Sequence, residues 1–326
     1  MSGTLSEELR LNPAQQQVLD ELGTTDRPVF RSDLRADLRH NLEEALEPIL
    51  AQLGTEESDE GGPQLFVSKR ALGMVHGCEA RYVADQDEEF SWSIASARGS
   101  VAHKAIELMV AMRGNPTPLD LVEAALARIE ADEKSLSSFI QELPENDRAE
   151  LAGRANDFVS TFTETFPPLN RRWVPVAESS VRSHLCSDRL TLMGKIDLQL
   201  GRTRGQEAGK VLIDLKTGQP SYAHLEDLRF YALLETLKVG VPPRLLVNYY
   251  LDAGMPRNES VTEDLLWAAA QRVVDGMARM VAVTPPASRE PTRTPGANCR
   301  FCPLNDSCEP GMAHLEARSQ DDWRPS

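Results

Sequence analysis

The sequence predicts an α/β protein in which a mixed central sheet is flanked by helices. Residues 98–166 place apolar side chains at three- and four-residue intervals, which is typical of helices. After Pro167 and Pro168 the pattern changes to strand-like segments, and one further helix interrupts them. The order of helix, three strands, helix and strand indicates a mixed α/β domain. The expected strands are 173–185, 190–200, 210–215 and 245–251, and the expected helices between and after them are about 222–238 and 262–283.

Length and composition describe an ordinary soluble protein. The chain has 326 residues, enough for one large domain or two ordinary ones, with 41% hydrophobic and 26% charged residues. No apolar run is long enough to span a bilayer, and the N-terminal residues lack the basic and apolar regions of a signal peptide. We therefore expect a cytoplasmic protein. Thiols are reduced in that compartment, so clustered cysteines favour metal binding over disulfides.

The charge balance is acidic and uneven. Lys and Arg number 35 against 50 Asp and Glu, for a net charge of −15. Residues 1–65 hold 14 acidic and 5 basic residues, a net −9, so the rest of the chain carries −6. An acidic average disfavours tight, salt-insensitive DNA binding by this chain alone, but it leaves room for a local basic groove.

The N-terminal part is expected to be helical. Asn12 and Pro13 predict the start of a helix over residues 13–22, and leucines at helical spacing predict a second over 32–53, capped by Ser32. An acidic linker rich in glycine and proline follows at 55–63. We divide the chain into a helical acidic extension, 1–63, and a second domain, 64–326. The extension is either an accessory helical hairpin or a docking element for a partner.

Two strands carry the acidic residues that a metal ion could use. Strand periodicity places Asp197 on one face of its strand with Lys195 and Gln199, opposite the apolar Leu192, Ile196, Leu198 and Leu200. The same periodicity makes Asp214 and Lys216 project together from the next strand. Carboxylate oxygens suit Mg²⁺ or Mn²⁺, and a nearby lysine can orient a water molecule. The alternative is a surface ion pair between Asp214 and Lys216.

His103 and Glu107 lie one helical turn apart in residues 99–107. A neutral imidazole can bind a metal, although a lone histidine on a helix is more often packed or solvated. Ser68, Lys69 and Arg70 are candidates for contacts with phosphate or, equally, solvated charges.

The cysteines suggest a second metal site. Cys299, Cys302 and Cys308 form a C-x2-C-x5-C run, and Cys78 stands far upstream. Thiolates hold both zinc and iron–sulfur clusters, but structural zinc sites usually combine two short ligand pairs. The spacing favours iron–sulfur, while zinc and unligated thiols stay open. Cys186 has no partner at ligand spacing.

The motifs occur in a familiar order. Gly99-x3-His103-x3-Glu107, then Gly194 to Asp197, then Ile213-Asp214-Leu215-Lys216-Thr217-Gly218 resemble the RecB-type branch of the PD-(D/E)xK nucleases over residues 66–312. Together with the cysteines they resemble its iron–sulfur subset, which includes AddB-type subunits and CRISPR-associated RecB-like exonucleases. The resemblance implies a restriction-endonuclease-like core with a cysteine-rich C-terminal tail.

The resemblance also implies roles for individual residues. The metal ligands would be His103, Asp197, Asp214 and the Leu215 carbonyl, and Asp197, Asp214 and Lys216 would be catalytic. A 4Fe-4S cluster would be held by Cys78, Cys299, Cys302 and Cys308. Where the family usually has Gln-x3-Tyr, this chain has Asp227 and Tyr231, so the usual contacts with substrate are in doubt. Candidates for that side of the site are Glu107, Asp227 and Tyr231, with helix packing as the alternative for Tyr231.

These expectations describe a Mg²⁺- or Mn²⁺-dependent deoxyribonuclease. We expect an exonuclease that acts on DNA single strands or ends in repair, recombination or defence, with a helicase or another repair or defence subunit as candidate partner. The chain has no G-x4-G-K-[ST] motif and is not itself a P-loop motor. The alternatives are a non-catalytic DNA-binding or scaffold subunit and a zinc-stabilised interaction module.

Overall fold

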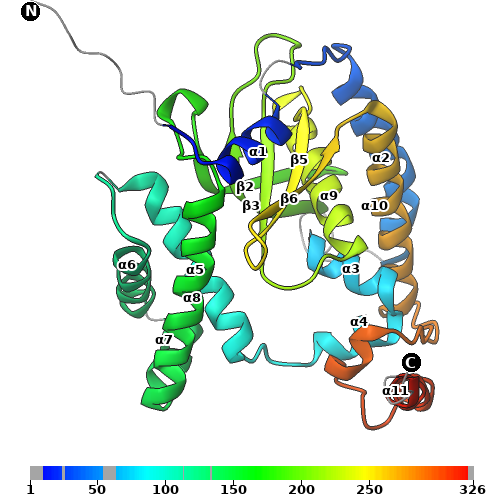
Figure 1. Ribbon diagram of the computed structural model, residues 1–326. Helices are drawn as coiled ribbons and strands as arrows, with labels where there is room; N and C mark the ends of the chain where they lie inside the picture. The colour runs from blue at the N-terminus through cyan, green and yellow to red at the C-terminus, as the bar shows by residue number, and fades with distance from the viewer. Residues whose placement is uncertain (1–9, 24–25, 54–63, 113, 133, 322–326) are drawn as a thin grey trace, which may run out of the picture.

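The computed structural model describes residues 10–321 except 24–25, 54–63, 113 and 133. Its centre is one six-stranded sheet with helices on both faces, which confirms the predicted fold class (Figure 1). The strands are β1 Leu65–Ser68, β2 Val176–Leu185, β3 Leu190–Leu200, β4 Val211–Lys216, β5 Leu245–Tyr250 and β6 Met255–Ser260.

Helices precede, separate and follow these strands. The α-helices are α1 Pro13–Leu22, α2 Leu34–Leu50, α3 Lys69–Gly77, α4 Glu79–Gln86, α5 Ile94–Ala111, α6 Pro118–Ala131, α7 Ser135–Glu142, α8 Glu145–Thr165, α9 Tyr222–Val239, α10 Glu263–Val283 and α11 Glu309–Asp321. Short 3-10 helices are η1 Ala51–Leu53, η2 Arg171–Trp173 and η3 Ala297–Phe301. Among the described helices, none is both long and apolar enough to cross a membrane.

β3 organises the sheet. The strand order is β1-β3-β4-β5-β6, and β2 pairs with β3 outside this path. β2 runs antiparallel along one side of β3. On the other side, β1 pairs in parallel with Leu190–Met193, whereas β4 pairs antiparallel with Leu198–Leu200. The sheet therefore forks around residues 194–197, because β1 ends before β4 begins its pairing.

Two hydrophobic clusters cover the sheet. One joins α2, α9 and α10 to the sheet, and the other joins α5, α6 and α8 to it. Simple alternation predicted that Leu192, Ile196, Leu198 and Leu200 share one face of β3. That prediction was wrong, because Leu192 and Ile196 enter the first cluster and Leu198 and Leu200 the second. A long strand that changes partners midway coils, so alternation along it does not mark one flat face.

The N-terminal helices pack against the helices and strands of the rest of the chain. Five leucines at helical spacing on α2 are buried in the same cluster as α9 and α10. The helix begins two residues later than predicted, with Asp33 and not Ser32 at the N-cap position. Residues 55–63, the predicted linker, lie wholly outside the described residues. The domain division at residue 63 stays a prediction.

The pattern missed five elements, and each is short or polar. β1, α3, α4, β6 and α11 were not predicted. β6 is an edge strand of sequence MPRNES with mostly exposed side chains, so it has no hydrophobic alternation to detect. The segment 98–166, predicted to be largely helical, consists of α5 through α8.

Candidate active site at the fork of the sheet

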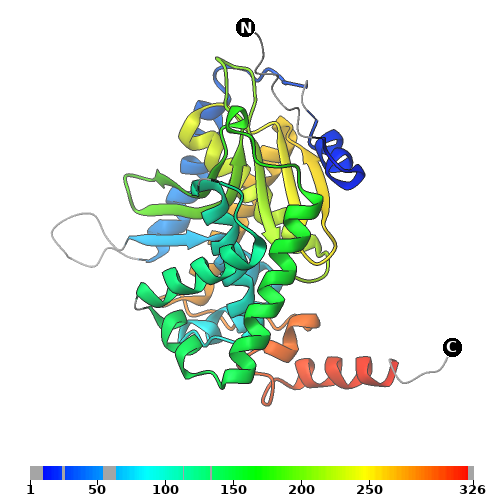
Figure 2. The same cartoon turned by 60° about the vertical axis from the view of Figure 1, so that its left-hand side comes forward.

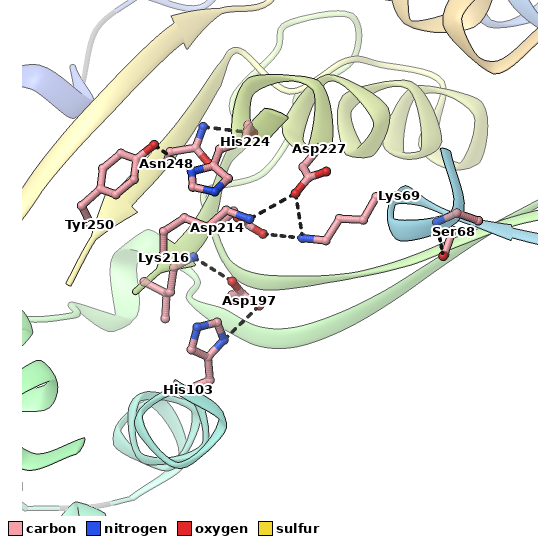
Figure 3. Close-up of polar contacts among 12 residues, drawn as sticks. Ser68, Lys69, His103, Asp197, Asp214, Lys216, His224, Asp227, Asn248 and Tyr250 are labelled. Atoms are coloured by element: carbon pink, nitrogen blue, oxygen red, sulfur yellow. Dashed lines mark hydrogen bonds and ion pairs between the residues drawn. The ribbon is translucent and has the colours of Figure 1, made fainter. Parts of the chain in front are cut away.

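The predicted site residues meet where the sheet forks (Figure 3). Asp197 lies on β3 within the fork, and Asp214 and Lys216 lie at the end of β4. α5 brings His103 from one side, whereas α9 and the start of α3 bring Asp227 and Lys69 from the other. Residues from five elements thus converge where, within the described structure, the edge of β3 opposite β2 lacks a neighbouring strand.

One half of the site is a group of possible metal ligands around Asp197. His103 Nδ1 lies 3.4 Å from Asp197 Oδ1, and the backbone N–H of Leu215 donates to Asp197 Oδ2 at 2.7 Å. Ligand atoms of His103, Glu178 and Asp197 all lie within 4.8 Å of one another. The Leu215 carbonyl stays a predicted ligand. Its N–H, however, ties β4 directly to the Asp197 side chain.

Sequence reasoning missed Glu178. This residue lies on β2 between Ala177 and Ser179, which pair with Leu198 and Ile196, so it faces Asp197 across the two strands. Its φ of 54° departs from strand geometry and breaks the local pairing. Lys195 forms an ion pair with it. The sequence offered no signal, because the pairing of β2 with β3 decides which acidic residue lies opposite Asp197.

The other half is a ring of alternating charges. Lys216 Nζ lies 2.6 Å from Asp214 Oδ2 and 3.2 Å from Asp227 Oδ2. Lys69 Nζ lies 3.0 Å from Asp214 Oδ1 and 3.6 Å from Asp227 Oδ2. We call these four residues the charge ring. It contains the Asp-x-Lys motif, and it adds a second lysine that the motif does not include.

Burial and charge act against each other in this ring. Burial alone would raise the pKa of Asp214, but Lys69 and Lys216 outweigh it and hold that pKa below its usual value. Burial likewise opposes the charge on Lys69, yet Asp214 and the other nearby acidic groups raise the pKa of Lys69 above its usual value. Both groups are therefore ionised at neutral pH, and the ring is held together by charge.

Tyr231 packs beside Lys69 of the charge ring. It is buried, and burial raises its pKa to about 12, so the hydroxyl stays protonated. Lys69 Nζ lies 4.9 Å from the centre of its ring. A Cβ at Gly194 would come within 2.3 Å of the Tyr231 ring, so the fork requires glycine there. Such overpacking costs about 1–3 kcal/mol.

The remaining predicted residues divide. Asp227, placed where the family usually has glutamine, joins the charge ring. Glu107 pairs with Lys104 at 2.6 Å and lies outside the ligand group around Asp197. Its contact with substrate stays a prediction. Asn248, opposite Asp214 on β5, is buried and donates to the backbone of His224 at 3.2 Å.

The donor set fits a divalent cation. Asp214 Oδ2 is buried and lacks a hydrogen bond of good geometry among the described residues, although Lys216 contacts it as an ion pair. Carboxylate oxygens with one imidazole are suitable ligands for Mg²⁺ or Mn²⁺. Burial opposes protonation of His103, but Asp197 outweighs it and raises the pKa of His103. The negative potential responsible for that shift would also attract a cation.

The four predicted cluster cysteines line one cavity. Cys78, Cys299, Cys302 and Cys308 border a volume of about 370 Å³ beside Lys69 and Asp227. The Thr294 and Gly296 N–H groups donate to the sulfurs of Cys78 and Cys299 at 3.4 and 3.3 Å. Cys186 is buried elsewhere, where its N–H donates to Glu43.

The sulfur spacing bears on the kind of metal. No three of these sulfurs within the described residues lie within 4.8 Å of one another. A tetrahedral zinc ion with bonds of about 2.3 Å would bring them to about 3.8 Å. Within the described residues, the four sulfurs are therefore not gathered as closely as one tetrahedral zinc ion would hold them.

Comparison with known proteins supplies the family. A family model described as the PD-(D/E)XK nuclease superfamily matches residues 67–309. The chain belongs to this superfamily. Its members are nucleases that generally use a divalent cation, and DNA is the substrate that membership implies. No curated protein sequence matches the chain.

Two solved structures show distant similarity. One is a protein from Eubacterium rectale provisionally named an exonuclease, with 13% identity, a TM-score of 0.45, and coverage of 76% of this chain and 87% of that one. The other is a protein designated SSO0001, with 13% identity, a TM-score of 0.32, and coverage of 65% and 95%. Both scores are low, so the family assignment depends on the family model alone.

Proposed function

We propose that this superfamily member is a RecB-like, metal-dependent deoxyribonuclease that acts as an exonuclease on single strands or DNA ends. The observation that carries the proposal is the convergence at the fork of an acidic ligand group and the Asp-x-Lys pair. Structural ion pairs alone do not require a half-buried imidazole, two further carboxylates and the buried Asp214 carboxylate at one point.

Each residue has a role in this proposal. Asp197, Asp214 and His103 would hold the cation, with Glu178 as a further ligand. A cation bound there would supply Lewis-acid activation of water and of the phosphodiester. Lys216 would orient the attacking water and offset negative charge that develops on the phosphoryl group. Asp227 would restrain both lysines until substrate arrives, since it contacts each of them.

The test is cleavage of 5′-labelled and 3′-labelled DNA, single-stranded and duplex, with a circular single strand of the same sequence as control. We expect the linear strands to shorten from an end and the circle to survive. Cleavage should stop in EDTA and return with added Mn²⁺ or Mg²⁺. Stable binding without any cleavage in either metal would instead support a non-catalytic DNA-binding subunit. Cleavage of the circular strand would show that the protein is an endonuclease and not an exonuclease.

We also propose a structural 4Fe-4S cluster at the four cysteines. The wide sulfur spacing, the cavity and the N–H donors to two sulfurs support it. Such a group would join the junction of α3 and α4, where Cys78 lies, to the segment after α10, a closure over more than two hundred residues. It would stabilise that junction and take no part in hydrolysis.

Anaerobic purification with iron and zinc analysis tests the cluster. We expect a brown protein with a broad absorption band near ~400 nm. Cys78→Ser should lower iron content and melting temperature together, and the matched control Cys186→Ser should leave iron content unchanged. One zinc per chain and no iron would support the zinc-stabilised module. A helicase or other partner subunit and a cytoplasmic location remain part of the proposal.

A further inference from the structure

A second concentration of positive charge lies away from the fork. Arg27, Arg172, Arg202 and Arg204 surround a hollow of about 450 Å³. An adjoining hollow of about 220 Å³ shares Arg27 and Arg172 with it and adds Arg244 and Trp173. We call these five arginines and their shared space the arginine hollow. The arginine hollow shares no residue with the Asp-x-Lys site.

The hollow is built from segments that are fixed to one another. Ala208 N–H donates to Pro28 O at 2.8 Å, and Gly201 N–H donates to Trp173 O at 2.5 Å. The loop after β3 is closed by mutual backbone hydrogen bonds between Arg204 and Glu207. A Cβ on Gly201 would lie 2.2 Å from Gly209 O, so this glycine lets the two arms of the loop approach. The arginines therefore project from a braced scaffold.

Among the residues that the structure describes, these guanidinium groups have no carboxylate in an ion pair with them. Across the described part of the chain, the side chains of Arg27, Arg172, Arg202 and Arg204 form neither an ion pair nor a hydrogen bond, whereas Arg244 donates to the backbone of Leu22 at 2.8 Å. Asp26, which acts on the Arg244 charge, and Glu207, which pairs with Arg204 through the backbone, are exposed acidic residues on the same segments. The lining of the hollow itself includes five arginines and no acidic residue.

The guanidinium groups also repel one another. Burial, and then the neighbouring Arg27, lower the pKa of Arg244 below its usual value. Like charges held together on a fixed scaffold gain most from a ligand of opposite charge. Guanidinium forks match phosphate oxygens in geometry, and a half-exposed tryptophan beside them offers a surface on which a base can stack.

The arginine hollow lies beyond the end of β3, at a distance from the proposed metal ligands. Gly201 follows the end of β3, and Asp197 lies earlier on the same strand. From Asp197 to Leu200 the strand advances three residues, about 10 Å at ~3.3 Å per residue. A strand of DNA rises ~3.4 Å per nucleotide, so this separation spans about three nucleotides. Figures 1 and 2 show the β3–β4 loop and the cysteine-bearing tail at opposite ends of the molecule.

We propose that the arginine hollow is a second DNA-binding site, which holds the phosphates of a strand some nucleotides away from the bond that is cut. The choice of DNA as the polyanion rests on the proposed nuclease function. The hollow would compensate for the net charge of −15 by concentrating substrate at one local positive surface. It would hold a strand between successive cuts.

The test is DNA binding without cleavage, measured by fluorescence anisotropy with a labelled 16-nucleotide single strand in EDTA over a salt series. The variant is Arg202→Gln with Arg204→Gln, because both residues are exposed and their side chains have no bonds to lose within the described structure. The matched control is Arg128→Gln with Arg279→Gln, two exposed arginines on α6 and α10 whose side chains likewise form no ion pair or hydrogen bond within the described residues.

We expect the hollow variant to bind on the order of tenfold more weakly at low salt, and the slope of log affinity against log salt to fall by about 1.4 for two lost phosphate contacts. The control should match the wild type. Equal loss in both variants, or unchanged affinity and slope in the hollow variant, would overturn the proposal. This experiment measures binding and not cleavage. If the protein binds DNA through the arginine hollow but never cleaves it, the proposed nuclease function is wrong and the proposed binding site stands.

Discussion

The charge ring and the arginine hollow concentrate charge in opposite ways. In the ring, two carboxylates and two ammonium groups lie within 3.6 Å of their partners and are largely buried. In the hollow, five guanidinium groups share an open space without a carboxylate ion pair in the described structure. A self-neutralised site exerts little attraction beyond a few ångströms, whereas an uncompensated one attracts a polyanion over about a Debye length. In the roles proposed above, the ring would act on a bound phosphodiester, and the hollow would attract and hold the DNA strand.

The largest effect should come from removing the acid that anchors the ring. Asp214→Asn keeps the shape of the side chain but takes away the charge that would hold a cation. We expect cleavage to fall on the order of a thousandfold, measured on labelled DNA in excess Mn²⁺, with circular dichroism to verify folding. Asp157→Asn, an exposed acid on α8, is the control. An Asp214→Asn enzyme with more than about a tenth of normal activity would remove Asp214 from the proposed site.

Replacing the two lysines of the charge ring should affect different kinetic constants. Lys216→Met should lower kcat by on the order of a hundredfold, because Lys216 is the lysine of the Asp-x-Lys motif and makes the shorter contact with Asp214, at 2.6 Å. Lys69→Met should cost about tenfold, mainly in KM. Lys69 borders the cavity lined by Arg70, Arg81 and Arg293, where it can turn toward a phosphate. The reverse order of effects on kcat would make Lys69 the catalytic lysine.

The smallest effect should come from a change that gives the charge ring an excess of positive charge, like that of the arginine hollow. Asp227→Asn leaves two ammonium groups against the single carboxylate of Asp214. We expect DNA to bind about threefold more tightly in EDTA at low salt, with a steeper salt dependence, because one phosphate then replaces the lost carboxylate. Anisotropy with the 16-nucleotide strand measures this. Weaker binding would mean that Asp227 orders the lysines more than it neutralises them.

The candidate site was predictable in part. The motifs at His103, Asp197 and Asp214-Leu215-Lys216 were read from the sequence, and the structure brings those residues together at the fork. Lys69 was marked only as a phosphate contact or a solvated charge, and Glu178 was not marked at all. Both belong to short or irregular segments, where a single charged residue carries no pattern of its own.

The arginine hollow could not have been predicted from the sequence. Its arginines come from residues 27, 172, 202, 204 and 244, in segments that share no motif. They meet because the N-terminal segment pairs with the loop after β3, through backbone hydrogen bonds such as Ala208 to Pro28. The net charge of −15 argued against a DNA-binding surface, because an average over the whole chain conceals a local excess of positive charge.

By itself the sequence determined the fold class, most helices and four of the six strands, because hydrophobic periodicity reports which faces are buried. Ordered motifs likewise determined which carboxylates and which lysine to consider. Only the tertiary structure decided that β1 stops short of β4, which opens the fork, and that Lys69 and Glu178 face it. Strand pairing is a long-range interaction, and local sequence does not encode which distant residue will lie opposite a given side chain.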